Sequence, residues 1–271
     1  MISIDIKASN QILLKSLTNL GLNNIQGTVV YTAIFGNFDT LNEVRHPKST
    51  VNYICFTDQA DLTSDTWLIV QCRDMNNDSR LFAKVFKVFP HKIFKNANRS
   101  LWIDGNYLIK KNHWKFLDSH ENVSHIKFYR HSLRACIYDE AKVLKSDKPE
   151  FDPESITKQM NRYMNENMPS MQGLINGAII LRNHASPLLP KLMDDWWYEI
   201  YNYSIRDQLS FNYVDWKNGS IAEYFSENIT DFTYFSYRPH LVMGKDSRWL
   251  RIKFLIRSFI GSAIGYVRNK R

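Results

Sequence analysis

The segment TVVYTAIFGN, residues 28–37, decides the fold class of this 271-residue chain. Residues 28–35 form a continuous run of apolar, β-branched and aromatic side chains, which Gly36 and Asn37 end. A strand that is buried on both faces has this composition, because it lacks the polar alternation of a half-exposed strand. Such strands occur mainly in parallel sheets covered by helices. Residues 28–35 therefore predict a central strand of an α/β fold.

The sequence on both sides of this segment alternates between two hydrophobic periods. Short apolar runs predict further strands at residues 51–57, 66–71, 100–103 and 177–182. Apolar residues spaced three or four apart predict helices at residues 79–89, 187–201 and 207–213, with a weak helical pattern over 10–20. Strands that alternate with helices predict a mixed, mostly parallel sheet flanked by helices.

The charge of the chain is unevenly distributed. The net charge is +8, but seven of the 35 Lys and Arg residues lie in residues 248–271, which contain no Asp or Glu. The other 247 residues carry 28 basic and 27 acidic side chains, so they are close to neutral. Binding to nucleic acid needs many clustered phosphate contacts. We therefore expect no nucleic-acid partner.

The cysteines and the N-terminal residues indicate the cellular compartment, and the charge distribution indicates how the chain is divided. Cys55, Cys72 and Cys136 show no C-x-x-C spacing, and no secretory signal is legible in residues 1–27, so we expect a cytoplasmic protein. The predicted parts are an N-terminal lead-in (1–27), a central α/β domain (28–247) and a basic, apolar tail (248–271). The tail could bind an anionic membrane at its inner face or pack on the body as a last helix. Deletion of residues 248–271 should release the protein from anionic liposomes if the first alternative is correct.

The segment SLWIDGN, residues 100–106, carries polar side chains of particular chemical interest. A buried strand there brings Asp104 and Asn106 to one side of a turn. Mg²⁺ and Mn²⁺ prefer carboxylate, carbonyl and water oxygens, so these residues suit a divalent cation that bridges a diphosphate. D-G-N is also a common turn sequence, and an ordinary turn is the alternative explanation.

Six segments, in chain order within residues 28–217, together resemble one known family. They are YTAIFGNFD (31–39), ICFTD (54–58), R-x-x-A-K-x-x-K-x-x-P-H (80–91), WIDGN (102–106), H-x-x-R-x-C-I-Y-D-E-A (131–141) and RDQLSF (206–211). The family is glycosyltransferase-like, was long described as a domain of unknown function, and has plant members linked to pectin and mucilage galacturonosyl transfer. The resemblance implies a GT-A type fold, similar in layout to the retaining, nucleotide-sugar-dependent transferases of glycosyltransferase family eight.

This resemblance implies a role for each candidate site residue. The nucleotide would be lined by Tyr31, Thr32 and Ala33, with Thr57 and Asp58 beside the base or ribose. The diphosphate or donor sugar would be reached by Arg80 and Lys84, and the leaving phosphate by Lys245. The metal ligands would be Asp104, Asn106 and His240. The sugar and acceptor would be bound by His131, Arg134, Asn176, Gly177, Arg206 and Gln208, with Asp207 orienting the donor sugar.

Several alternatives stay open at this stage. Arg80 and Lys84 could be the solvated face of a helix, and His131 and Arg134 could pair with Asp139 or Glu140. Asn106 stands where family eight usually has Asp, which bears on metal affinity.

The expected function is transfer of a hexosyl or uronosyl group from a nucleotide-diphosphate donor, UDP-linked, to a glycan or lipid-linked acceptor, with a divalent cation. The alternative is a non-catalytic module that binds a nucleotide sugar or a glycan. The sequence contains neither a P-loop motif nor G-x-G-x-x-G, H-E-x-x-H or G-x-S-x-G, so P-loop, Rossmann, zincin and serine-hydrolase chemistries lack their usual signatures.

Overall fold

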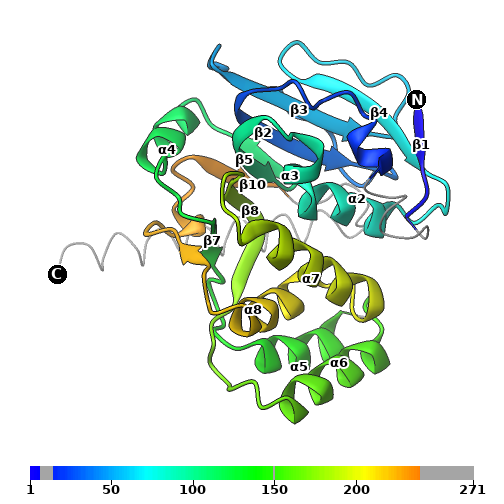
Figure 1. Ribbon diagram of the computed structural model, residues 1–271, viewed down its shortest axis with the longest axis vertical. Helices are drawn as coiled ribbons and strands as arrows, with labels where there is room; N and C mark the ends of the chain where they lie inside the picture. The colour runs from blue at the N-terminus through cyan, green and yellow to red at the C-terminus, as the bar shows by residue number, and fades with distance from the viewer. Residues whose placement is uncertain (7–14, 149, 239–271) are drawn as a thin grey trace.

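The computed structural model describes residues 1–6, 15–148 and 150–238, which surround one eight-stranded sheet (Figure 1). The strand order is β1-β4-β3-β2-β5-β8-β7-β9. Their bounds are β1 Ile2–Ile4, β2 Gly27–Ile34, β3 Val51–Thr57, β4 Leu68–Asp74, β5 Ala97–Ile103, β7 Ile126–Arg130, β8 Ile175–Asn183 and β9 Glu223–Tyr224. Within this sheet β8 runs antiparallel to its neighbours β5 and β7, whereas all other pairs are parallel. The predicted fold class, a mixed and mostly parallel sheet flanked by helices, is confirmed.

The helices and a small ribbon complete the described structure. The helices are α2 Ser79–Val88, α3 Pro90–Ile93, α4 His113–Ser119, α5 Ile137–Asp147, α6 Pro153–Asn165, α7 Leu189–Asn202 and α8 Asp207–Lys217, with a single 3₁₀ turn, Ile229–Asp231. A two-stranded antiparallel ribbon joins β6 Tyr107–Ile109 to β10 Phe235–Tyr237. In Figure 1, α7 and α8 lie between the sheet and the pair α5 and α6.

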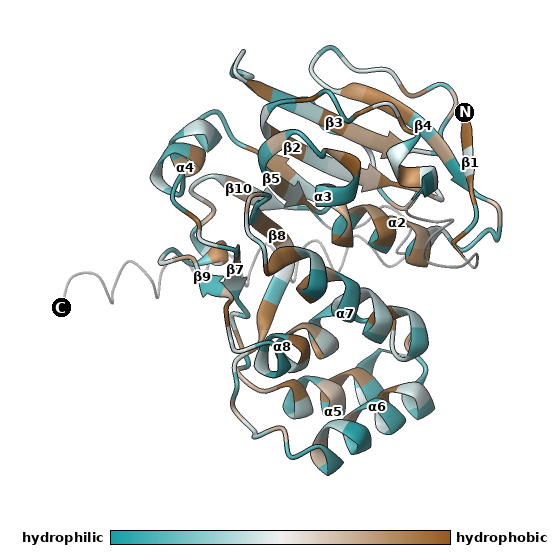
Figure 2. Ribbon diagram, in the orientation of Figure 1, coloured by the Kyte–Doolittle hydropathy of each residue, from teal (hydrophilic) through white to brown (hydrophobic). Residues whose placement is uncertain are grey.

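Helix α2 shows why the sequence pattern produces this packing. Its apolar stripe buries Phe82, Val85 and Phe86 against the sheet, and Phe86 stacks on Phe56 of β3 with ring centroids 4.3 Å apart. Asp78 caps the helix, since its carboxylate accepts a hydrogen bond from the Leu81 amide at 2.9 Å. Figure 2 shows apolar residues on the central strands and on the stripes of the helices that face them. The helix is therefore fixed by burial of one face and by its cap.

The ends of the chain differ from the predicted organisation or lie outside the described residues. Residues 2–4 form the edge strand β1, parallel to β4, so the N-terminal lead-in contributes to the same sheet as the rest. Of the weak helical pattern over residues 10–20, the described part is helical at residues 15–18. His240, Lys245 and the basic tail 248–271 lie outside the described residues. Within the described part, no helix is both long and apolar enough to cross a membrane.

Candidate active site

A cleft opens at the carboxyl ends of β2 and β5 and reaches across to α5, α8 and the loop before α6. Its main part has a volume of about 1120 Å³. A smaller recess of about 280 Å³ shares several lining residues with it. The recess is lined by Lys84, Lys87, Asp104, Asn106, Tyr107, His131, Asn176, Gly177, Ala178, Arg206, Asp207, Gln208 and Tyr237. Nine of the predicted site residues thus meet in a space beside the strand ends, where open α/β sheets bind ligands.

The turn after β5 brings Asp104 to the cleft. The Asp104 amide donates to the Ala178 carbonyl at 2.8 Å, which ties the turn to β8. One carboxylate oxygen, Oδ1, accepts a hydrogen bond from Trp102 Nε1 at 2.6 Å and lies 3.2 Å from the Lys87 ammonium. Gly105 fits here because a Cβ at this position would lie 3.0 Å from the Ile34 side chain. The D-G-N sequence therefore forms a turn that also presents its carboxylate to the cleft.

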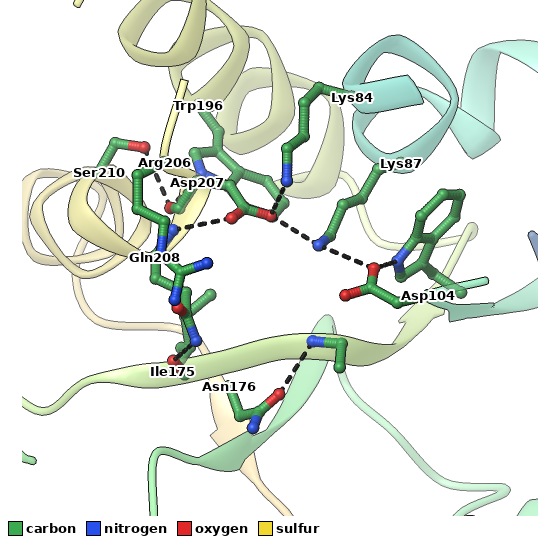
Figure 3. A network of polar contacts seen from close by, with 12 residues as sticks. Lys84, Lys87, Asp104, Ile175, Asn176, Trp196, Arg206, Asp207, Gln208 and Ser210 are labelled. Carbon is green, nitrogen blue, oxygen red and sulfur yellow. Dashed lines mark hydrogen bonds and ion pairs between the residues drawn. The ribbon is translucent and has the colours of Figure 1, made fainter. Parts of the chain in front are cut away.

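A chain of ion pairs crosses the recess (Figure 3). The Asp207 carboxylate, on the first residue of α8, lies 2.9 Å from the Lys84 ammonium and 2.6 Å from that of Lys87. Lys87 also pairs with Asp104, so it bridges two carboxylates from different parts of the chain. The side chains of Lys87 and Asp207 are 2% and 3% exposed, respectively, which makes their interaction much stronger than a surface ion pair.

Burial and charge act against each other on the pKa values of these groups. Burial alone would raise the pKa of Asp207, but the ammonium groups of Lys84 and Lys87 hold it well below its usual range. Burial lowers the pKa of Lys84 to about 8, although Asp207 opposes that shift. Burial would lower the pKa of Lys87 too, but its two carboxylate partners raise it above the ordinary lysine value. Lys87 is thus a permanent cation at neutral pH.

Strand β8 lies directly against these ion pairs at Gly177. A Cβ on Gly177 would lie 3.3 Å from both Asp207 Oδ2 and Lys87 Nζ. The flanking contacts fix the strand, because Asn176 Oδ1 accepts the Ala178 amide at 3.0 Å and Gln208 Nε2 donates to the Ile175 carbonyl at 3.0 Å. Trp196 Nε1 donates a hydrogen bond to the main-chain carbonyl of Asp207 at 3.1 Å. The absence of a side chain at Gly177 therefore lets β8 approach the ion pair of Asp207 and Lys87 closely.

A second charged cluster lines the outer wall of the cleft. Glu140 of α5, buried, accepts a hydrogen bond from Arg134 Nε at 2.5 Å and pairs with Arg206 Nη2 at 3.3 Å. The Phe151 ring lies 4.9 Å from the Arg80 guanidinium and 5.7 Å from that of Arg206. Arg134 therefore pairs with Glu140, as one of the alternatives stated. Arg134 and Arg206 also line the cleft.

His131 lies on the loop between β7 and α5. Its Nδ1 accepts the Arg134 amide at 3.1 Å, and its own amide donates to the Leu174 carbonyl at 2.8 Å. Burial lowers the pKa of His131, although Glu140 opposes that shift. His131 thus contributes its imidazole ring to the lining of the cleft.

Three of the predicted nucleotide contacts are buried away from the cleft. Tyr31 is fully buried, with its ring edge on Phe94 and Trp102. It shares a face of β2 with Ala33 but lies two residues farther from the end of the strand, so the core covers it. Thr32 and Thr57 are buried as well, and neither lines the cleft.

The other two predicted nucleotide contacts are Ala33 and Asp58, of which one lines the cleft. Asp58 does not line the cleft; its carboxylate accepts the Gly36 amide at 3.0 Å and so fixes the turn after β2. Of the five predicted contacts, Ala33 lines the cleft.

Among the cleft residues that sequence reasoning did not name as site residues are Lys87, Trp102, Glu140 and Phe151. Lys87 had a legible signal, since a lysine stands within the apolar stretch Val85 to Phe89 of α2. Glu140, Phe151 and Trp102 have no comparable signal, because tertiary contacts with other segments determine where they lie.

The oxygen atoms near Asp104 fit a divalent cation in part. Asp104 supplies a carboxylate at the cleft and Asn106 an amide in the recess, both of the hard-oxygen type that Mg²⁺ and Mn²⁺ prefer. Within the described residues, no three His, Cys, Asp or Glu side chains group closely enough to bind a metal ion. The third predicted ligand, His240, is outside the described part.

Fold and cleft together define an α/β protein with a polar, strongly charged binding site at the carboxyl ends of its parallel strands. The chain belongs to the TOD1/MUCI70 glycosyltransferase-like domain family, which matches residues 13–233. This confirms the family resemblance predicted from the six sequence segments.

Known proteins resemble the chain over most of its length. It is 27% identical over 224 residues to the probable hexosyltransferase MUCI70 of Arabidopsis thaliana, covering 72% of this chain and 38% of that protein. The chain thus spans well under half the length of this relative. Two solved structures are similar at 13% identity over 74% of this chain. They are apo mouse xyloside xylosyltransferase 1 (TM-score 0.45, 85% of that chain) and the apo bifunctional glycosyltransferase WbbM (TM-score 0.43, 39% of that chain).

Proposed function

We propose that this protein is a glycosyltransferase that moves a sugar from a nucleotide-diphosphate donor to an acceptor hydroxyl during assembly of a surface glycan. The observation that carries the proposal is the ion-pair chain in which Lys84 and Lys87 share Asp207, and Lys87 also reaches Asp104. Family membership and the likeness to a probable hexosyltransferase support the same class of reaction.

The cations of the cleft suit a departing diphosphate. When the bond between the anomeric carbon and the phosphate oxygen breaks, negative charge grows on the nucleotide diphosphate, and fixed cations stabilise that charge. Arg80 lines the main cleft, and among the described residues no carboxylate forms an ion pair with it, so its charge is available to a phosphate. Lys84 retains 23% exposure, follows Arg80 by one turn of α2, and lines both the main cleft and the recess. Lys245 would add a further cation under this proposal.

Asp207 suits the sugar side of the reaction. Its carboxylate is held in one orientation by Lys84, Lys87 and the Gln208 amide, the last at 3.1 Å from Oδ1. A fixed carboxylate can accept a hydrogen bond from a hydroxyl of the sugar that is transferred. It can also balance the positive charge that develops on the sugar ring. We propose retention at the anomeric carbon, in line with the resemblance to family eight, and a UDP-linked donor.

Asp104 and Asn106, with His240, would hold a divalent cation, which when bound would neutralise diphosphate charge. The acceptor hydroxyl would approach past His131, Arg134, Arg206, Asn176 and Gly177, which line the opposite side of the recess or cleft. A glycan or lipid-linked acceptor fits this open side.

The test is a thermal-shift screen of nucleotide sugars with and without Mn²⁺, followed by donor hydrolysis in the absence of acceptor. A ligand that binds the folded state at 100 times its Kd adds about 2.7 kcal/mol to the free energy of unfolding, which raises the melting temperature. We expect one donor to raise it and to release nucleotide diphosphate slowly. Asp104→Ala should reduce that release by about 100-fold, the usual cost of removing one group that stabilises transition-state charge.

Asp118→Ala is the matched control for Asp104→Ala. Asp118 also forms one ion pair, with Lys48 at 3.2 Å, but its side chain is 51% exposed and does not line the cleft. A donor that shifts the melting temperature without any release of nucleotide diphosphate would instead establish a non-catalytic binding module. No shift with any nucleotide sugar would contradict the proposal.

A further inference from the structure

Arg182, on β8, is a fully buried arginine that has an unusual set of partners. Its side chain is 0% exposed, and among the described residues no carboxylate forms an ion pair with it. Nη2 donates to the main-chain carbonyl of Lys87 at 2.7 Å, and Nη1 donates to the Tyr31 hydroxyl at 3.3 Å. A buried guanidinium without a carboxylate is costly, so these two neutral acceptors need an explanation.

The position of Lys87 at the end of α2 explains why its carbonyl needs a donor. The helix ends at Val88, and Pro90 follows the C-cap residue Phe89. The last carbonyls of a helix have no intrahelical partner, and proline has no N–H to offer them. A cation at this end also interacts favourably with the helix dipole. Arg182 supplies both a donor and a positive charge.

Tyr31 connects the same carbonyl to the Asp104 turn. Its hydroxyl lies 3.5 Å from the Lys87 carbonyl, and its ring packs edge-on against Trp102 with centroids 5.3 Å apart. Trp102 in turn donates to Asp104. Burial raises the pKa of Tyr31 far above the usual value, so the hydroxyl keeps its proton and remains a donor.

We propose that Tyr31 and Arg182 form a positioning pair that fixes the main chain of Lys87, so that its ammonium reaches Asp104 and Asp207 at once. Neither residue lines the cleft, so the pair acts through Lys87 and not on the ligand. The catalytic part of this inference rests on the proposed function, but the structural part does not. It also gives Tyr31 a role different from nucleotide binding.

Acetylation of lysines tests the positioning directly. Lys87 is 2% exposed and paired twice, so it should react slowly with an acetylating reagent, whereas Lys142, with 75% exposure, should react fast and serve as the internal reference. We expect Tyr31→Phe and Arg182→Lys to increase the acetylation rate of Lys87 about tenfold, since each removes a buried hydrogen bond that resists local opening. Mass spectrometry of the labelled peptides measures the rates.

Tyr53→Phe is the matched control. Tyr53 is a buried tyrosine on β3 whose hydroxyl contacts His113 at 2.6 Å, in the core on the other face of the sheet. The Tyr53→Phe change should leave the acetylation rate of Lys87 unchanged. Equal acceleration in this control, or full protection of Lys87 in folded Tyr31→Phe, would overturn the proposal.

A kinetic measurement separates this inference from the proposed function. With the donor found by thermal shift, Tyr31→Phe should lower kcat about tenfold and leave the KM for the donor within twofold, because the binding groups themselves are retained. If the wild-type protein transfers no sugar, the acetylation result still decides whether Tyr31 and Arg182 position Lys87. Faster acetylation with unchanged kcat would overturn the catalytic part alone.

Discussion

Asp207→Asn is expected to remove most of the transferase activity and a large part of the stability. The change leaves two ammonium groups, those of Lys84 and Lys87, beside a neutral amide in a buried recess. Breaking a buried ion pair by removal of one partner costs about 3–5 kcal/mol. Loss of a fixed charge from the reacting centre should lower kcat by about 1000-fold. Chemical denaturation and donor turnover measure the two effects.

The pH dependence of stability gives a second measurement for the same variant. The pKa of Asp207 is lowered in the folded state, so its contribution is present above the unfolded value of about 3.9 and disappears as the pH falls through the folded value. The difference in unfolding free energy between wild type and Asp207→Asn should therefore be constant from about pH 5 to 7 and shrink below about pH 4.

Asp215→Asn is the control on the same helix. Asp215 is buried and accepts the Ala222 amide at 3.0 Å, and burial raises its pKa. Among the described residues, no lysine forms an ion pair with it. Asparagine can still accept that hydrogen bond, so a small stability change and normal activity are expected. A difference curve for Asp207→Asn that does not shrink in acid would show that the ion pairs contribute little.

The fold could be predicted from sequence where hydrophobic period alone determines the element. The run at residues 28–35 became β2, and the stripe ending at Pro90 became α2. The reversed direction of β8 could not be predicted, because its apolar run GAIILR has the same composition in either direction. Strand β1 was also missed, since three residues are too few to show a period.

The candidate site could be predicted in part for the same physical reason. Residues that directly follow a strand or start a helix, such as Asp104 and Asp207, were predicted and do line the recess. The positions of residues that other elements cover, or that pair with a distant partner, were not predicted. Tyr31 was assigned to the nucleotide although its side chain points into the core, and Lys87 was passed over although it links both carboxylates.

The site therefore depends on Lys87 in a way that no single segment shows. Three chain segments meet at its ammonium, namely the turn after β5, the start of α8 and, through the close approach of Gly177, strand β8. The turn and the start of α8 each bring a carboxylate, and that of Asp207 is buried. Lys87 makes these groups compatible, so changes at this residue should act on both sides of the recess.

Lys87→Met is expected to reduce kcat/KM about 1000-fold, because it removes the cation that bridges Asp207 and Asp104. Among the described residues, Asp207 keeps its ion pair with Lys84, and Asp104 keeps its hydrogen bond from Trp102 Nε1. Stability should fall by about 3 kcal/mol, at the lower end for a broken buried pair, since Asp104 is 34% exposed and regains water. Lys142→Met, at an exposed position, should change neither quantity.

The double variant Lys87→Met with Asp207→Asn separates charge pairing from simple packing. If the two residues interact as the 2.6 Å contact indicates, the double variant should be less destabilised than the sum of the two single changes, by about 1–3 kcal/mol. Activity should stay as low as in either single variant, because the two groups act as one unit and the second loss removes nothing further. Stability losses that simply add would mean that Lys87 and Asp207 are not energetically coupled, and that the cleft is organised by packing and not by this ion pair.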